Sequence, residues 1–427
     1  MRPPGGPMKP ARKVYVVGAH HTPYIGKFHP DFVWKKHPDF GKRENPGIEH
    51  YLHTAALGAL EDAGLPPAQV QKGFVGNFVG ELFVQQGHLG SVLASAHPDF
   101  QGKPFARLEG ACASGGLALA AGIDAVSAGL DVVLVVGAEV QTTENAKVGA
   151  DYLARAAHYR TQRGIDPFTF PALFARRTKA VFEATDLDAT DLARVVANAY
   201  ANAARNPLAH RRAVGISFEQ ACEASEANPT FLSNEELRPY LKISDCSQVS
   251  DGGSAVILVS EEGLRKAGKT PADAVEVIAY GHATGPIEGP SDLTRMEVTA
   301  AAAREAYESA GVGPADVDVA ELHDCFSIAF CLALEACGLV PKDGLKQFLA
   351  EGAFALEGRL PVNTGGGLLA FGHPVGATGV KQAGEIFRQL QGRCGDYQVP
   401  GSPTTGLTQN MGGDDRTAVV TLYRKPS

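Results

Sequence analysis

Ala-Leu-Glu-Asp-Ala-Gly-Leu-Pro-Pro-Ala-Gln-Val, at residues 59–70, reappears in altered form as Ala-Tyr-Glu-Ser-Ala-Gly-Val-Gly-Pro-Ala-Asp-Val at residues 306–317. Each stretch has the pattern of a helix that ends at glycine and is followed by a proline-containing turn into a strand. Upstream of the two stretches, the apolar strand at 14–17 has a counterpart at 275–278. The match indicates that the chain contains a diverged copy of itself.

Downstream of the two stretches, a glycine-rich turn leads into a helix twice, at residues 110–116 and at residues 372–379. Each predicted helix is followed by a β-branched strand, at 132–136 and at 418–422. Strands that alternate with helices predict an α/β layer structure in each half. We therefore expect a duplicated α/β fold with five α-β-α-β-α layers, in which the helices after the two turns lie side by side at the centre.

The order of the segments predicts three domains. The N-terminal half comprises residues 13–140 together with 243–260, and the C-terminal half comprises residues 275–427. Residues 141–242 interrupt the first half with helical patterns and scattered arginine, asparagine and proline, so we expect an inserted loop or cap domain there. Residues 261–274 are expected to link the two halves.

Composition places the chain among folded proteins and excludes several classes of function. Of 427 residues, 44% are hydrophobic and 20% are charged, which gives no case for disorder. A net charge of −8 leaves no basic stripe for phosphates, so nucleic-acid binding is not expected. No apolar stretch is long and uninterrupted enough for a membrane span. Seven cysteines without paired spacing, and no recognisable targeting signal, predict a reduced protein of the cytoplasm.

Two side chains at the glycine-rich turns are candidates for catalysis. Cys112 lies where the predicted strand 104–108 turns into a helix, and the backbone amides at a helix start are expected to lower the pKa of its thiol. His373 lies between glycine and proline at the equivalent place in the second half, so its ring is expected to have a fixed direction. From the turns alone, Cys112 could equally be a small buried residue and His373 a structural histidine.

A second pair of chemically active side chains, His323 and Cys325, follows the predicted strand 318–322. Sites in α/β folds form at the carboxyl ends of strands, which favours both residues as members of a site. Asp324, between them, is interpreted as a helix cap. Three cysteines recur every sixth residue along a predicted helix, about 240° apart around its axis, so they cannot share a metal ion. We therefore expect no metal site at Cys325, Cys331 and Cys337.

Three segments resemble active-site loops of the thiolases. They are Gly-Ala-Cys-Ala-Ser-Gly at 110–115, Leu-His-Asp-Cys-Phe at 322–326, and the glycine-rich segment 363–379 that contains Gly-His-Pro. The His-Asp-Cys-Phe form is similar to the sterol-carrier-protein branch of that family, whereas other thiolases carry Asn-Glu-Ala-Phe. The resemblance runs in order through nearly the whole chain. It implies the thiolase fold and implies that Cys112 and His373 are catalytic.

The chain departs from the thiolase pattern in its fourth loop, which usually offers Cys-x-Gly before the final strand. The matching segment, residues 407–413, has no cysteine, and we interpret Gln409 as standing in its place. In similar members of the sterol-carrier-protein branch, the task of that thiol falls to the cysteine that is Cys325 here. Asp-Asp-Arg at 414–416 has no assigned role, and the extended segment 28–46 is expected to be a surface loop or a partner contact.

The resemblance implies acyl transfer between coenzyme A thioesters, by thiolytic cleavage of a 3-ketoacyl-CoA or by the reverse Claisen condensation. His373 would take the proton of Cys112, whose thiolate would then hold the acyl group as a thioester. Cys325 would remove the α-proton of acetyl-CoA. The groups expected to stabilise oxyanions are the His323 side chain and the backbone N–H groups of Cys112, Met411 and Gly412.

Acyl-CoA and coenzyme A are the implied substrates, and no tightly bound cofactor is expected. The coenzyme A tail is expected to lie against the inserted domain, where the candidates for its phosphates are Arg176, Arg177, Arg211 and Arg212. A homodimer or a dimer of dimers is implied by the family. Three alternatives stay open: a ketoacyl-synthase-like condensing enzyme, a non-catalytic subunit with a small OB-fold partner, and a retro-aldol lyase on acyl-CoA that would not need Cys112.

Overall fold

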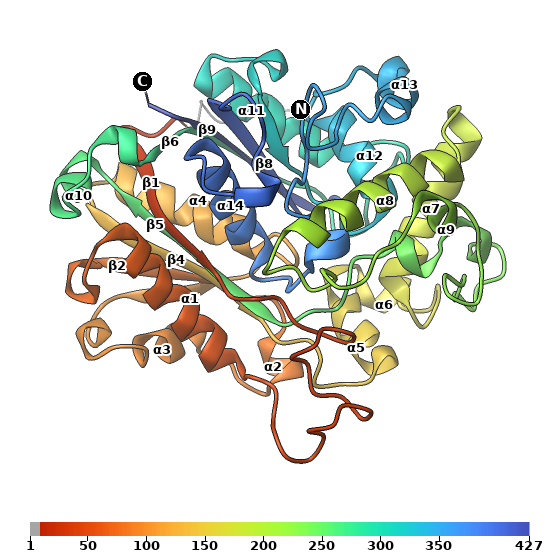
Figure 1. Cartoon of the computed structure of the whole chain (residues 1–427), viewed down its shortest axis with the longest axis horizontal. Helices are drawn as coiled ribbons and strands as arrows, with labels where there is room; N and C mark the ends of the chain where they lie inside the picture. The colour runs from red at the N-terminus through yellow and green to blue at the C-terminus, as the bar shows by residue number, and fades with distance from the viewer. Residues whose placement is uncertain (1–8, 427) are drawn as a thin grey trace.

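A computed structural model describes residues 9–426 of the chain (Figure 1). Its strands are β1 (Val14–His21), β2 (Lys72–Gly76), β3 (Phe105–Leu108), β4 (Val132–Glu139), β5 (Gly252–Val259), β6 (Val275–Thr284), β7 (Val319–Glu321), β8 (Thr405–Gly412) and β9 (Thr417–Arg424). Its α-helices are α1 (Ile48–Ala63), α2 (Gly80–Phe83), α3 (Leu89–Ala94), α4 (Ser114–Ser127), α5 (Ala146–Leu153), α6 (Tyr159–Gln162), α7 (Thr169–Ala184), α8 (Ala189–Arg205), α9 (Phe218–Cys222), α10 (Glu261–Lys266), α11 (Glu297–Ala310), α12 (Ser327–Ala336), α13 (Leu345–Ala350) and α14 (Thr378–Leu390).

The strands of the described part of the chain form one sheet in the order β3-β2-β4-β5-β1-β6-β9-β8-β7. It has two leaves, one from β3 to β1 and the other from β6 to β7. The leaves are joined where residues 14–16 of β1 pair antiparallel with residues 275–277 of β6. In the first leaf β2 runs parallel to β3 and β4, and in the second β7 runs parallel to β8, while the other neighbours are antiparallel. The two leaves thus repeat one mixed topology.

Helices α4 and α14 lie between the two leaves. Helix α4 contacts β2 and β4 of the first leaf and β8 and β9 of the second, and α14 contacts β5 and β1 of the first leaf and β8 and β7 of the second. Helix α1 packs on β1, β5 and β4, and α11 packs on β6 and β9. The layers are therefore α-β-α-β-α, as the sequence predicts, with α4 and α14 near the centre of Figure 1.

Strand β4 shows why its sequence is apolar along its whole length. Val133 and Val135 point into the core that α4 and α14 share with both leaves, whereas Leu134 and Val136 point into the core beneath α1. Successive side chains of a strand face opposite sides of its sheet, so a strand covered by helices on both faces needs apolar residues at every position.

The repeated stretches of sequence adopt the same backbone conformation. Helix α1 ends at Gly64 with φ 71° and ψ 27°, and α11 ends at Gly311 with φ 70° and ψ 32°. This left-handed conformation suits glycine because it has no Cβ atom. A 3-10 turn follows each glycine, at 67–69 and at 314–316, and leads to β2 and β7 respectively. The structure therefore confirms the duplicated fold.

Between β4 and β5 the chain leaves the sheet and forms α5 to α9, and α7 and α8 pack against α12 at the right of Figure 1. We propose that this segment, residues 141–242, is a domain inserted into the N-terminal half. The predicted linker at 261–274 contains α10, which contacts β1 and β5. Residues 28–46 form turns, with Phe28 and Phe40 more than half exposed, as expected for a surface loop. Within residues 9–426, no helix combines the length and apolar character needed to cross a membrane.

Candidate active site

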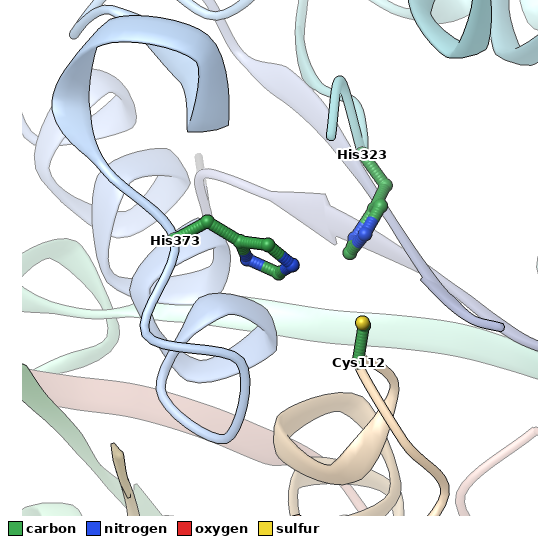
Figure 2. A group of neighbouring side chains, drawn as sticks. All are labelled: Cys112, His323 and His373. Carbon is green, nitrogen blue, oxygen red and sulfur yellow. The ribbon is translucent and has the colours of Figure 1, made fainter. Parts of the chain in front are cut away.

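Three segments that are far apart in the sequence bring Cys112, His323 and His373 together. Cys112 lies just before α4, His323 follows β7, and His373 lies between the π-helical turn Gly367–Phe371 and α14. Ligand-type atoms of the three side chains, the Cys112 sulfur and a ring nitrogen from each histidine, all lie within 4.8 Å of one another. Figure 2 shows the sulfur and both rings directed into one common space.

Close contact between the starts of α4 and α14 produces this convergence. A Cβ atom on Gly115 would lie 2.9 Å from both the Gly376 carbonyl oxygen and the Gly379 nitrogen. Such distances leave no room for a side chain, so glycine is required where the two helices meet. Ala111, in the tight turn before Cys112, has the left-handed φ of 54°, and the Glu109 carboxylate accepts a hydrogen bond from its N–H. The turn therefore fixes the direction of the thiol.

The hydrogen bonds of His373 define which of its nitrogens carries the proton. Its Nδ1 lies 2.6 Å from the Thr378 hydroxyl oxygen, and that hydroxyl donates to the Pro374 carbonyl at 3.2 Å. Assigning the single hydroxyl hydrogen to the Pro374 carbonyl, which can only accept, makes His373 Nδ1 the donor to Thr378. The Nε2 atom is buried and has no hydrogen-bond partner among the described residues. His373 therefore presents a free lone pair beside the thiol.

His323 has the opposite arrangement. Its Nδ1 lies 3.0 Å from the side-chain nitrogen of Asn410, which is a donor, and its Nε2 is buried without a partner in residues 9–426. The rings of His323 and His373 meet edge to face with centroids 5.0 Å apart. The two imidazoles are thus not equivalent, although both are adjacent to Cys112.

Burial determines the charge state of the three groups. It raises the pKa of Cys112 to about 12 and lowers the pKa of His373 to about 3. Burial and the nearby His373 also hold the pKa of His323 well below its usual value. The expected lowering of the Cys112 pKa by the helix start is therefore wrong: desolvation outweighs the backbone N–H groups of Cys112 and Gly413, which favour the thiolate. At neutral pH the site holds a neutral thiol and two neutral imidazoles.

Cys325 is close to the three groups but is not a member of their cluster. It is buried, and its pKa is raised well above the usual value by burial and by the negative charge that Cys112 carries when ionised. Helix α12 begins after it, so of the three spaced cysteines only Cys331 lies inside that helix. The interpretation of Asp324 as a helix cap is wrong. Its carboxylate accepts a hydrogen bond of 2.6 Å from the Leu368 N–H and so holds the π-helical turn before His373.

The fourth loop differs from expectation in two ways. Met411 and Gly412 end β8 and do not form a turn, and the backbone N–H that favours the Cys112 thiolate is that of Gly413. Gln409 is directed elsewhere: its side-chain oxygen accepts from the His323 backbone N–H at 2.8 Å. The side chain that reaches the site is that of Asn410. It was missed from the sequence because Gln409, the preceding residue, was placed at the position of the usual cysteine.

Asp414, Asp415 and Arg416, which had no assigned role, fasten this loop to three other parts of the chain. The carboxylate of Asp414 pairs with the fully buried guanidinium of Arg177 on α7. Asp415 accepts hydrogen bonds from the N–H groups of residues 298 and 299 at the start of α11. Arg416 donates to the Ile287 carbonyl and to the Gln162 side chain. The contacts anchor the turn that contains Gly413.

Two further buried residues hold the loop of His373 and were not found from the sequence. Gln141 donates from its side chain to the His373 carbonyl at 2.7 Å and to the Ser250 carbonyl at 3.0 Å. The Glu139 carboxylate accepts from the Gly376 N–H at 3.1 Å and from the N–H of Phe78 at 2.9 Å. Glu139 is the last residue of β4 and Gln141 lies two residues after it, and polar side chains at the end of so apolar a run could have signalled a role.

The four candidate arginines differ in accessibility. Arg177 is fully buried and occupied by Asp414, so it is not available to a phosphate. Arg212 is exposed, Arg176 is partly exposed, and Arg211 is mostly buried beneath the Phe28 ring. A hollow of about 440 Å³ lies at α5, α6 and α7, and its lining residues are Lys147, Asp151, Arg163, Gly164, Asp166, Pro167 and Thr169.

Comparison with known families covers nearly the whole chain. The family model "Thiolase, N-terminal domain" matches residues 37–262, and the model "Thiolase C-terminal domain-like" matches residues 279–425. The chain is 38% identical over 374 residues to an acetyl-CoA acetyltransferase of Methanothermobacter thermautotrophicus, a match that spans 87% of this chain and 93% of that protein. It is 31% identical over 414 residues to a benzoylsuccinyl-CoA thiolase subunit of Thauera aromatica, and this match spans 96% of this chain and 97% of that protein.

Other similarities concern the branch and the fold. Sterol carrier protein 2 of Rattus norvegicus is 31% identical over 390 residues, spanning 87% of this chain and 66% of that protein, in keeping with the His-Asp-Cys-Phe segment. A solved structure titled "Ltp2-ChsH2(DUF35) aldolase" superposes with a TM-score of 0.73 at 22% identity, over 96% of this chain and 98% of that one, which supports the fold alone. With both of its halves matched by family models, the chain belongs to the thiolase family.

Proposed function

We propose that this chain is a thiolase that transfers acyl groups between coenzyme A thioesters through a covalent intermediate on Cys112. The observation that carries the proposal is the position of the thiol within 4.8 Å of a His373 nitrogen, together with the hydrogen bonds that leave His373 Nε2 with a lone pair. A nucleophile and an oriented base in reach of each other are the parts that acyl transfer needs.

In the cleavage direction, His373 Nε2 takes the thiol proton as the Cys112 sulfur attacks the 3-keto carbon of the substrate. The carbon–carbon bond then breaks, its electron pair passes to the departing acetyl-CoA as an enolate, and the Cys325 thiol supplies the proton that completes acetyl-CoA. The thiol of coenzyme A next attacks the acyl group on Cys112 and gives its own proton to the Cys325 thiolate. The acyl group leaves as a shortened acyl-CoA, and His373 returns its proton to the Cys112 sulfur. Condensation is the reverse sequence.

Two sets of donors surround the space above the sulfur. The Nε2–H of His323 is proposed to stabilise the enolate oxygen of acetyl-CoA. For the tetrahedral intermediate, the backbone N–H of Cys112 is proposed together with the Met411-Gly412 segment, to which we add Gly413 because its N–H lies at the thiol. Each such donor is worth about 3 kcal/mol in comparable enzymes.

The base that exchanges the α-proton is proposed to be Cys325. Its proximity to Cys112 supports this role, because the charge of one thiol raises the pKa of the other. Burial opposes ionisation of Cys325, so its thiolate is proposed to form only when the thiol gives a proton to the enolate, and it becomes a thiol again when it takes an α-proton from acetyl-CoA. His373 is the alternative base, since its lone pair already lies in the site.

Coenzyme A is proposed to approach along the inserted segment. Tyr152 and Phe170 pack against the same apolar cluster as Cys112, and each is adjacent in sequence to a residue that lines the hollow at α5 to α7. Lys147 and Arg163 supply positive charge there. We propose these two cations for the coenzyme A phosphates, and reversing both charges should raise the KM for coenzyme A with little change in the acylation of Cys112 by a short thioester.

A homodimer in the cytoplasm is the proposed state of the protein. The seven cysteines are free, which suits a reducing compartment. Strand β3 lies at an end of the sheet, where an edge strand can pair with a second copy. Sedimentation analysis at micromolar concentration tests the dimer, and a monomer would contradict it.

The experiment that tests the function is detection of the acyl-enzyme. After mixing with acetoacetyl-CoA, mass spectrometry should find an acetyl group on the peptide that contains Cys112, and Cys112→Ala should lack both the adduct and thiolysis. Cys222→Ala removes a partly exposed thiol on α9 and serves as the control. Full thiolysis by Cys112→Ala would refute the proposal.

A second candidate is a retro-aldol lyase subunit that works with a small partner. It is favoured by the structure titled as an aldolase complex and by the absence of a fourth-loop cysteine. A lyase would cleave a 3-hydroxyacyl-CoA without using Cys112. Cleavage of that substrate by Cys112→Ala, with no thiolysis by the unaltered enzyme, would establish the second candidate over the first.

A further inference from the structure

The orientation of the Asn410 amide is fixed by three hydrogen bonds at the junction of α4 and α14. Its side-chain oxygen accepts from the Gly116 N–H at 2.9 Å, while its nitrogen donates to the Cys112 carbonyl at 3.1 Å. Exchanging the oxygen and the nitrogen would set two donors against each other at Gly116 and two acceptors against each other at Cys112. The network therefore assigns the NH₂ group to the side that faces His323.

This orientation determines the tautomer of His323. The Asn410 nitrogen, a donor without acceptor capacity, lies 3.0 Å from His323 Nδ1, so that ring nitrogen must accept and carry no proton. Burial keeps the ring neutral, because the pKa of His323 is held well below its usual value. A neutral ring with a bare Nδ1 has its single proton on Nε2. That atom is buried without a hydrogen-bond partner among the described residues, on a ring that has one nitrogen within 4.8 Å of the Cys112 sulfur and of a His373 nitrogen.

We propose that Asn410 is a positioning residue that holds His323 in the Nε2–H tautomer, so that this imidazole donates a hydrogen bond in the site and can neither act as a base nor bind a metal ion there. The neighbouring His373 has the opposite tautomer because its Nδ1–H donates to Thr378. The role of the His323 Nε2–H in stabilising the enolate oxygen rests on the proposed function. The tautomer of His323 and the exclusion of a metal ion do not depend on it.

The metal part of the proposal follows from the same hydrogen bond. The thiol and the two imidazoles have ligand atoms within 4.8 Å of one another, close enough for the three side chains to be considered as a zinc site. A histidine that binds zinc through Nε2 normally donates its Nδ1–H to a carboxylate or carbonyl, which orients the ring and raises its basicity. His373 meets this requirement through Thr378, but His323 would turn an N–H toward the N–H of Asn410. One of the three ligands is thereby disabled.

Asn410→Asp reverses this hydrogen bond with almost no change in size. The introduced carboxylate can still accept from Gly116, and it would accept from His323 Nδ1–H, which moves the ring proton and frees Nε2. Gln409→Glu is the matched control. It introduces the same charge one residue earlier, where the side-chain oxygen faces the His323 backbone N–H and not the ring.

Nitrogen-15 NMR of histidine-labelled protein tests the tautomer directly, with His323→Gln used to assign the signals. The unaltered protein and Gln409→Glu should show His323 protonated at Nε2, and Asn410→Asp should show it protonated at Nδ1. If Asn410→Asp does not fold, two NMR measurements on the unaltered protein test the proposal. They are the tautomer of His323 and the scalar coupling across the hydrogen bond from the Asn410 nitrogen to His323 Nδ1. Protonation of His323 at Nδ1 in the unaltered protein overturns the proposal, as does an unchanged tautomer in folded Asn410→Asp.

Cobalt titration gives a second readout that does not depend on activity. Absorption from a thiolate–Co²⁺ bond should appear in Asn410→Asp at a cobalt concentration at least about tenfold lower than in the unaltered protein or in Gln409→Glu, because an outer hydrogen-bond partner changes metal affinity by about 10- to 100-fold. Equal affinities in all three proteins would overturn the metal part. If Cys112 is never acylated but the NMR and cobalt results hold, the proposed function fails and this inference stands.

Discussion

The hydroxyl of Thr378 is the contact whose removal should affect acyl transfer most specifically. It accepts from His373 Nδ1 at 2.6 Å and donates to the Pro374 carbonyl at 3.2 Å, which aims the free Nε2 of the ring at Cys112. Thr378→Val keeps the β-branched shape at the first residue of α14 and replaces the hydroxyl with a methyl group. The expected result is slower acylation of Cys112 in an enzyme that remains folded.

The size of the effect follows from the change of charge on His373. In the resting enzyme its bond to Thr378 joins two neutral groups and contributes about 0.5–1.5 kcal/mol, but once the ring has taken the thiol proton the bond involves a cation and contributes about 1.5–3 kcal/mol. The variant also loses the hydroxyl that selects the tautomer of His373. Because the bond is present in both states, only the difference of about 1–1.5 kcal/mol raises the barrier, which corresponds to a rate about 5- to 13-fold slower.

The assay is a single-turnover measurement of coenzyme A release or acyl-enzyme formation, with Thr378→Ser as the control that retains the hydroxyl. The serine variant should stay within a few-fold of the unaltered enzyme, and both variants should have nearly the same unfolding transition. If Thr378→Val acylates Cys112 at the rate of the unaltered enzyme, the base is not held by this hydrogen bond, and the assignment of His373 must be revised.

Three other outcomes are expected. Cys325→Ala should still acylate Cys112 but fail to exchange the α-protons of acetyl-CoA with deuterated solvent; exchange at the normal rate would leave His373 as the base. Arg177→Met should lower the free energy of unfolding by denaturant by about 3–5 kcal/mol, because it leaves the buried Asp414 carboxylate without its closest ion-pair partner. Arg176→Met is the control and should cost far less, because Arg176 is partly exposed and lies 3.9 Å from Asp414. Each buried histidine with a lowered folded-state pKa should reduce the stability by about 1.4 kcal/mol per pH unit as pH drops below 6.5, because it binds a proton only when the chain unfolds. The histidines concerned are His21, His210, His323 and His373. Buried carboxyls with a raised pKa, among them Glu139 and Asp251, act in the opposite direction over this pH range, so the test compares the unaltered protein with His210→Gln. A midpoint of chemical unfolding with the same pH dependence in both proteins from pH 7 to pH 5 would contradict the histidine contribution.

The fold was accessible from sequence because its signals are local and occur twice. A helix that ends at a left-handed glycine and enters a strand through a proline turn has one backbone solution, and Gly64 and Gly311 adopt it within a few degrees of each other. The convergence of Cys112 and His373 follows from the same repetition, since each lies before one of the two central helices. These inferences needed no knowledge of contacts between distant residues.

The parts of the site that sequence did not reveal depend on such contacts. Asn410 gains its role from Gly116 and His323, 294 and 87 residues away. The Cys-x-Gly pattern counted back from Gly412 gives residue 410, so the sequence carried a signal for the position of Asn410 but none for its contacts. Asp324 fits a helix cap by its position, yet the chain folds so that its carboxylate meets Leu368. The pKa of Cys112 was misjudged for the same reason: a helix start is a local feature, whereas desolvation depends on everything packed around the thiol.

The neutral state of the resting site has a consequence for how the nucleophile forms. With the pKa of Cys112 raised to about 12 and that of His373 lowered to about 3, the proton does not leave the sulfur before substrate arrives. In the proposed reaction, a carbonyl bound against the N–H groups of Cys112 and Gly413 would gather negative charge as the sulfur attacks, so the charges of the oxyanion and the His373 imidazolium would develop together and offset each other. A thiol kept neutral by burial is protected from oxidants and stray electrophiles, which react with thiolates. The same desolvation that opposes ionisation of Cys112 therefore makes its reactivity conditional on the substrate.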